Sequence, residues 1–160
     1  MSPRGHLNAR LVGVTGGRQH LATPALVIDL PAFERNMALM MEHCRSQGLA
    51  LRAHAKTHKS VTIAQRQLAA GAIGQCCAKL GEAEALADGG IDGLLVTSPV
   101  ASRQAFDRVA GLHARLQDFM IVADSNTCVD GYASALAGVG RPLKVLVDLD
   151  IGLHRTGRSE

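Results

Sequence analysis

Apolar and polar positions follow two alternating periods along the chain. Short runs of consecutive apolar residues predict buried strands, and longer segments with apolar residues three and four positions apart predict helices. Residues 31–48 show the helical period, because one apolar stripe is formed by Phe33, Met37, Met40, Met41 and Cys44. This pattern predicts strands at 25–30, 49–56, 73–79, 93–99, 118–124 and 142–150, separated by helices at 31–48, 60–71, 80–90, 100–116 and 125–140.

Strict alternation of strands and helices predicts an α/β fold with parallel strands and crossover helices. No G-x-G-x-x-G follows the first expected strand, which disfavours an open dinucleotide-binding sheet. Each strand–helix unit takes about 25 residues, close to the unit of a TIM (β/α)8 barrel, where eight units need about 250 residues. We therefore expect a partial TIM barrel, truncated after about six strands, as a piece of a longer protein. A complete small open sheet is the alternative.

The chain has a polar beginning and an apolar remainder. Residues 1–21 are a glycine-bearing lead-in without the unbroken apolar core of a secretory signal. Residues 22–160 are expected to form the barrel portion. No stretch of about 18 apolar residues predicts a transmembrane helix.

Composition narrows the classes of function. The chain is 47% hydrophobic and 19% charged, as expected of a globular protein with a packed core. With 2% aromatic residues and no long basic run, it lacks the features of a nucleic-acid-binding surface. Cys44, Cys76, Cys77 and Cys128 form no C-x-x-C pair, which disfavours a zinc site or a disulfide framework and favours reduced thiols in a cytoplasmic protein.

Five basic residues lie within positions 52–59, at the end of an expected strand. Reactive groups collect at the carboxyl ends of barrel strands. Alternation along the strand places Arg52, His54 and Lys56 on one face, with Lys56 nearest the barrel mouth. Basic neighbours and partial desolvation favour the neutral amine of Lys56, which could then form a Schiff base with a carbonyl. Lys59 is expected to face solvent, and a charged surface loop is the alternative interpretation of the whole segment.

Other expected strands also end in polar residues. Gln75 and Cys77 lie on the strand at 73–79, where packing inside the barrel is the alternative to a functional role. Asp148 and Asp150 lie near the end of the last strand. An ion pair with Lys144 or Arg155 is as consistent with their positions as catalysis is.

Three segments in the expected order resemble the fold-type III pyridoxal-phosphate enzymes. They are HAKTHKS (54–60) after TPALVIDL (23–30), the third and fourth strand–helix units at 71–100, and VLVDLDIGLHRTG (145–157). The resemblance covers residues 22–157 and is greatest to the group of D-threonine aldolase and eukaryotic-type D-serine dehydratase. Alanine racemases are more distant, and the fold implied is a barrel of the alanine racemase N-terminal type.

The resemblance implies roles for particular residues. Lys56 matches the lysine that binds pyridoxal 5'-phosphate covalently, and Arg155 matches an arginine near the 3-oxygen of the pyridoxal ring. His54 and Thr57 flank the lysine, while Gln75 and Cys77 lie where the third strand approaches the ring. No residue of this chain matches a metal ligand, because the family's divalent metal is bound by residues that would follow Glu160.

The implied activity is that of a lyase acting on D-3-hydroxy amino acids. We expect a D-threonine aldolase, which cleaves its substrate to glycine and an aldehyde. D-serine dehydratase is one alternative, and an amino-acid racemase or a non-catalytic pyridoxal-phosphate-binding homologue is another. The expected partner is a small D-amino acid, and the full-length protein is expected to be a cytoplasmic homodimer.

Overall fold

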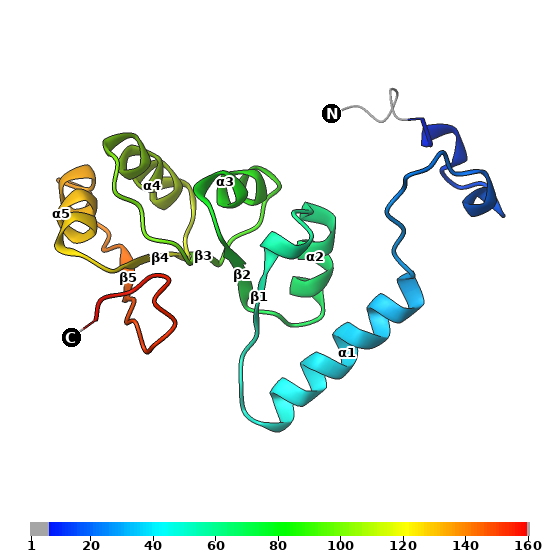
Figure 1. Cartoon of the computed structure of the whole chain (residues 1–160), viewed down its shortest axis with the longest axis horizontal. Coiled ribbons are helices and arrows are strands. Elements are labelled where there is room, and N and C mark those ends of the chain that lie inside the picture. The colour runs from blue at the N-terminus through cyan, green and yellow to red at the C-terminus, as the bar shows by residue number, and fades with distance from the viewer. Residues whose placement is uncertain (1–6, 160) are drawn as a thin grey trace. The chain divides into compact units, whose positions relative to one another are not determined.

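The computed structural model describes residues 7–159 of the chain (Figure 1). Its contacts divide the chain into two compact units, Met1–Asn36 and Met37–Glu160. The predicted boundary after residue 21 stays a prediction.

Among its described residues, the first unit contains the short 3-10 helices η2 (Ala9–Leu11) and η3 (Gly17–His20). The strand predicted at 25–30 is wrong, because these residues pair with no strand in the described chain, and Leu26 is fully exposed. An apolar run of high β propensity forms a strand only where a neighbouring strand satisfies its backbone groups.

Helix α1 (Leu30–Ser46) begins one residue before the predicted helix. The carboxylate of Asp29 accepts a hydrogen bond from the backbone N–H of Ala32 at 2.9 Å, as a capping residue does. Gly48 follows the helix with φ +64°, which glycine adopts without strain.

The second unit contains five parallel strands in the order of the sequence. They are β1 (Arg52–His54), β2 (Gly74–Cys77), β3 (Leu94–Val96), β4 (Phe119–Ala123) and β5 (Lys144–Val147). Consecutive parallel pairing is the arrangement of a barrel wall, and the predicted α/β class is confirmed.

The helices between the strands are α2 (Val61–Ala69), α3 (Leu80–Asp88), α4 (Arg103–Arg115) and α5 (Asn126–Ala135). Helices α3, α4 and α5 lie side by side along the sheet (Figure 1). The hydroxyl oxygens of Ser60 and Ser102 accept backbone N–H groups at the starts of α2 and α4. The predicted helix at 60–71 is therefore confirmed.

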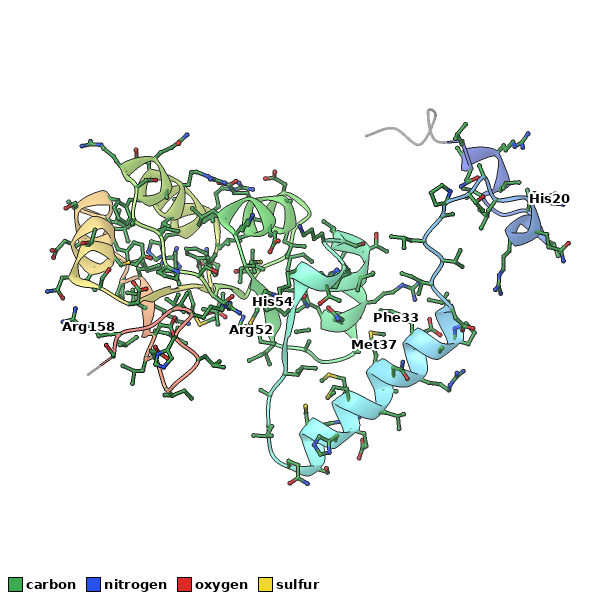
Figure 2. All side chains as sticks on the ribbon, in the orientation of Figure 1. His20, Phe33, Met37, Arg52, His54 and Arg158 are labelled. Atoms are coloured by element: carbon green, nitrogen blue, oxygen red, sulfur yellow. The ribbon has the colours of Figure 1, made fainter. Side chains whose placement is uncertain are left out.

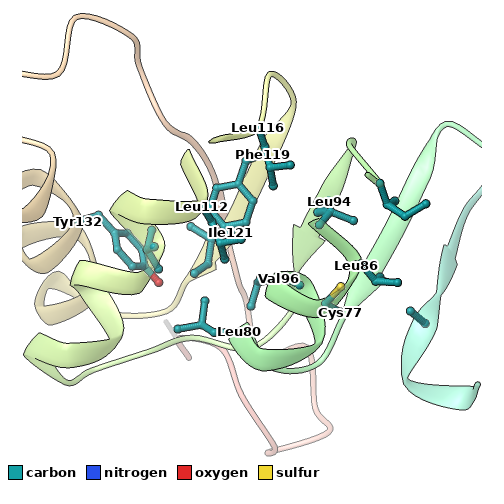
Figure 3. Close-up of a cluster of buried hydrophobic side chains, with 14 of the residues drawn as sticks. Cys77, Leu80, Leu86, Leu94, Val96, Leu112, Leu116, Phe119, Ile121 and Tyr132 are labelled. Atoms are coloured by element: carbon teal, nitrogen blue, oxygen red, sulfur yellow. The ribbon is translucent and has the colours of Figure 1, made fainter. Parts of the chain in front are cut away.

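The hydrophobic core lies between the sheet and these helices (Figure 3). Cys77, Leu94, Val96, Phe119 and Ile121 point into this core and are at most 1% exposed. Because side chains alternate along a strand, the register assigns the opposite face to His54, Cys76, Leu95 and Met120, which pair in one row across the sheet. In a barrel this second face is the interior.

Candidate functional site

Lys56 lies on a 3-10 turn, η4 (Ala55–Thr57), that follows β1 directly. The carbonyl oxygen of Ala55 accepts the backbone N–H groups of His58 at 3.1 Å and of Lys59 at 2.7 Å. These bonds turn the chain away from the sheet, so the predicted strand through residue 56 is wrong in its last two positions. Ala55 is buried in the core, whereas Lys56 is exposed at the carboxyl end of the sheet.

The ring of His54 connects this turn to the neighbouring strands (Figure 2). Its Nδ1 accepts the backbone N–H of Lys56 at 3.4 Å, and its Nε2 lies 3.4 Å from the hydroxyl oxygen of Thr97. That hydroxyl donates its proton to the carbonyl of Cys77 at 3.1 Å. Nε2 of His54 must therefore be the donor to Thr97, which defines a neutral imidazole protonated at Nε2.

Electrostatics favour the same neutral form of His54. Its pKa is lowered first by burial and then by the positive charge of Lys56, against the opposing charge of Glu82. Arg155 lowers the pKa further. The charges of Lys56 and Arg155, about a hundred residues apart in the sequence, thus act on one imidazole.

Arg155 lies in a loop that follows β5 and closes on itself. Backbone bonds between Asp150 and Arg158 and between Arg158 and Asp148, at 3.1 and 2.9 Å, join the two ends of the loop. Inside it, the carboxylate of Asp150 accepts the backbone N–H groups of Gly152 and His154, each at 2.9 Å.

His154 is the hydrogen-bond partner of Asp150 in this loop. Its Nδ1 lies 2.8 Å from the Asp150 carboxylate, and its backbone has φ +51°, which is unusual for a residue other than glycine. The hydrogen bonds from His154 and Gly152 hold the pKa of Asp150 below its usual value. The partner of the Asp150 carboxylate is therefore His154, and not Arg155 as considered from the sequence.

Lys59 differs from Lys56 in its surroundings. Its ammonium lies 3.6 Å from the carboxylate of Glu82, on the side of helix α3. Glu82 also accepts the backbone N–H of Ala78 at 2.8 Å, which fixes the carboxylate. Glu82, the acidic residue of this region, therefore pairs with Lys59, and the exposure of Lys59 to solvent agrees with the sequence prediction.

Gln75 and Cys77 do not share a face with His54. Cys77 lies in the core, and burial together with the charge of Glu82 raises the pKa of its thiol to about 12. Gln75 is fully buried on the same face, paired in register with Leu94. The predicted orientation of both residues toward the barrel interior is wrong, because the register places Cys76 opposite His54 instead.

Arg52 lies on the interior face but at the other end of the sheet. Its guanidinium donates to the carbonyl of Gly93 and lies 3.4 Å from Asp118, which also binds the ammonium of Lys144 at 2.7 Å. Lys144 and Arg52 lower the pKa of Asp118. Arg52 thus joins the amino ends of the strands and lies away from the turn of Lys56.

The residues that hydrogen bonds bring together are Lys56, His54, Thr57 and Thr97, and Arg155 acts on this group through its charge, which lowers the pKa of His54. The hydroxyl of Thr57 donates to the His54 carbonyl at 3.4 Å and closes the turn. A primary amine at the carboxyl end of the sheet, with a guanidinium acting on the same imidazole, suits an aldehyde cofactor that carries negative charge on its ring. Sequence reasoning gave Thr97 no role, although its position near the end of an expected strand was a usable signal.

Comparison with known protein families identifies the chain. The family model for the alanine racemase N-terminal domain matches residues 28–160. The chain belongs to this family, whose homologous aldolases and dehydratases are fold-type III pyridoxal-phosphate enzymes. The predicted resemblance is confirmed.

Several curated relatives are similar over 86% of this chain. The 3-hydroxy-D-aspartate aldolase of Paracoccus denitrificans and the D-threonine aldolase of an Arthrobacter species are each 36% identical over 138 residues. The D-threo-3-hydroxyaspartate dehydratase of a Delftia species is 35% identical over 137 residues. The chain spans 36% of the length of each of these relatives.

Solved structures give the same fold. The D-threonine aldolase of Filomicrobium marinum superimposes with a TM-score of 0.83 at 38% identity, covering 86% of this chain and 37% of that one. The Delftia dehydratase superimposes with a TM-score of 0.77 at 34% identity, covering 86% and 36%. The predicted barrel type is therefore confirmed.

Metal-binding groups and membrane-spanning helices are both absent from the described residues. Among residues 7–159, no group of three or more His, Cys, Asp or Glu side chains is arranged to hold a metal ion. None of the helices in this part of the chain has the length and apolar character needed to cross a membrane.

Proposed function

We propose that this chain forms the lysine-bearing part of a pyridoxal-phosphate-dependent lyase that acts on D-3-hydroxy amino acids. The observation that carries the proposal is the position of Lys56, exposed at the carboxyl end of the sheet and tied through its backbone N–H to a neutral His54. Sequence similarity to aldolases of D-3-hydroxy amino acids supports the substrate class.

Each residue of the site has a distinct task. Lys56 binds the cofactor aldehyde through its side-chain nitrogen. Arg155 stabilises negative charge on the ring oxygen of the cofactor, and His54 orients the backbone of Lys56 without adding a positive charge. When bound, the cofactor supplies an electron sink for the negative charge that develops at the substrate Cα.

Aldol cleavage of D-threonine to glycine and an aldehyde is the preferred reaction. Higher identity and TM-score to a D-threonine aldolase structure than to the dehydratase structure support this preference. Dehydration of a D-3-hydroxy amino acid is the second candidate, because a dehydratase is 35% identical to the chain. Racemisation and cofactor binding without catalysis are the remaining alternatives.

A divalent metal, bound through residues beyond this chain, completes the proposed enzyme. One solved structure of the Delftia dehydratase is described as a metal-free form, which supports a metal requirement in that relative. The homodimer and the cytoplasmic location stay predictions.

Reductive trapping tests the proposal directly. The intact protein is incubated with pyridoxal 5'-phosphate and borohydride, and the labelled peptide is mapped by mass spectrometry. We expect the label on Lys56, with labelling lost in Lys56→Ala and retained in Lys59→Ala, a matched variant from the same turn. Label on Lys59, or none on either lysine, contradicts the proposal. Assays of glycine, aldehyde and keto acid from D-threonine and D-serine then distinguish cleavage from dehydration.

A further inference from the structure

His58 follows the turn of Lys56 in the sequence, whereas His54 precedes it. Like His54, it holds a backbone group through its ring. Its Nδ1 accepts the backbone N–H of Ser60 at 3.0 Å. This contact repeats the geometry by which His54 accepts the N–H of Lys56, also two residues further along the chain. Two histidine rings therefore hold the backbone before and after the turn.

Gln67 of helix α2 is the other side chain that acts on the ring of His58. Nε2 of His58 and Oε1 of Gln67 are both buried, and neither has a hydrogen-bond partner among the described residues. The side chain of Gln67 raises the pKa of His58, as a carbonyl oxygen does when it accepts from a ring N–H. The two orphaned atoms are thus a matched donor and acceptor.

The protonation state of His58 follows from these contacts. Because Nδ1 accepts from Ser60, the proton of the neutral ring must lie on Nε2, where it faces Gln67. Burial lowers the pKa of His58 and outweighs the opposing effects of Gln67 and Ser60. The neutral ring is therefore the form that fits both neighbours.

We propose that His58 is a positioning residue for Lys56, which ties the lysine turn to helix α2 through Ser60 and Gln67. Ser60 caps α2 through the N–H of Ile63, so the ring of His58 joins the turn to the N-cap residue of the helix. The backbone of Lys59 has φ +49°, which residues other than glycine rarely adopt, and the turn therefore needs this restraint. This proposal rests on the proposed function, because it assigns His58 to the cofactor lysine.

Substitutions at His58 separate its two contacts. In His58→Asn, the side-chain oxygen can replace Nδ1 as the acceptor from Ser60, as asparagine does in turns. His58→Leu removes both contacts and keeps the apolar volume, and Gln67→Leu removes only the contact with α2. His43→Asn, an exposed histidine on α1, is the matched control.

The first measurement needs no cofactor. Nitrogen-15 NMR of the intact apoprotein should show His58 protonated at Nε2 alone, and the Ser60 amide should exchange slowly with solvent. We expect His58→Leu to accelerate Ser60 exchange about tenfold or more, the equivalent of about 1.4 kcal/mol, and His58→Asn to restore protection. A His58 protonated at Nδ1, or unchanged Ser60 exchange in His58→Leu, overturns the proposal whatever the protein's function.

The second measurement concerns Lys56. Titration with pyridoxal 5'-phosphate should show about tenfold weaker binding in His58→Leu, weaker binding in Gln67→Leu, and nearly unchanged binding in His58→Asn and His43→Asn. Equal affinity in all four folded variants, with Lys56 still labelled by borohydride, overturns the positioning role and leaves the proposed function standing. Wild-type protein without label on Lys56 overturns both.

Discussion

Nε2 of His54 lies 3.4 Å from the hydroxyl oxygen of Thr97, so the end of β1 is joined to the residue that follows β3. Because Thr97 donates its own proton to the carbonyl of Cys77, the hydrogen bonds run in one direction from the backbone of Lys56 to β2. A chain of bonds with a defined direction orients the ring as well as its proton. The position of the Lys56 turn therefore depends on three neighbouring strands.

Thr97→Val should weaken this arrangement without changing the shape of the side chain. The variant leaves Nε2–H of His54 without its acceptor, and we expect a loss of about 0.5–1.5 kcal/mol in the free energy of unfolding. Cofactor affinity should fall as well, because the His54 ring is less well oriented. Urea unfolding and absorbance titration measure the two effects. Thr97→Ser keeps the hydroxyl and should behave like the wild type, whereas equal losses in both variants would contradict the role of the hydroxyl.

The adjacent cysteines Cys76 and Cys77 should lose stability to different extents on the same substitution. Cys77→Ser places a hydroxyl in the hydrophobic core and should cost about 1–3 kcal/mol of stability. Cys76 lies on the face of His54 and is only partly buried, so Cys76→Ser should cost less. Chemical denaturation of the two variants provides the comparison.

Thiol reactivity checks the same assignment of faces. Since the thiolate is the reactive form, the buried Cys77 with its pKa near 12 should resist a thiol reagent under native conditions. Burial also raises the pKa of Cys76, but its partly exposed sulfur should react sooner. Faster labelling of Cys77 would mean that the register of β2 is shifted by one residue.

The order of the elements could be predicted from the sequence because each period has one physical cause. Helices pack one stripe against the sheet, and parallel strands covered by helices are apolar at successive positions. The segment at 25–30 shows where this reasoning fails. Its residues have strand-like side chains, but strand formation also depends on a hydrogen-bonding neighbour, which no local pattern reveals.

The site could be predicted only in part for a similar reason. Lys56 was found from its basic neighbours and its position after a strand. The face of β2 on which Gln75 and Cys77 lie could not be predicted. The sequence Gln75-Cys76-Cys77 has no alternation of polar and apolar residues that would distinguish the two faces of the strand. The turn at Ala55 depends on burial of that alanine in the core, which is a property of the folded chain.

Asp150 should control the loop that carries Arg155. Asp150→Ala removes the acceptor for the Gly152 and His154 N–H groups, so we expect faster amide exchange at both residues and weaker binding of pyridoxal 5'-phosphate. Asp150→Asn keeps a side-chain oxygen and should have a smaller effect. Amide exchange by NMR and absorbance titration measure the two outcomes.

Asp130→Ala serves as the control for the loop variants. Asp130 is an exposed aspartate on α5 and carries the same charge. If Asp130→Ala weakens cofactor binding as much as Asp150→Ala does, the effect comes from net charge and the loop has no special part in it.

Stability should fall as the pH is lowered from about 7.5 to about 5.5, because of His54 and His58. Both have folded-state pKa values below the ordinary value near 6.5, so the unfolded chain binds protons in this range more readily than the folded one. Stability rises with pH wherever the unfolded state holds more protons. Protonation also converts each Nδ1 from an acceptor into a donor that faces a backbone N–H. Asp118 and Asp150 titrate below this range, since their pKa values are lowered from about 3.8.

Urea unfolding at three pH values should show the decrease in the wild type and a smaller one in a variant with asparagine at both histidines. An equal pH slope in the double variant would assign the effect to other groups.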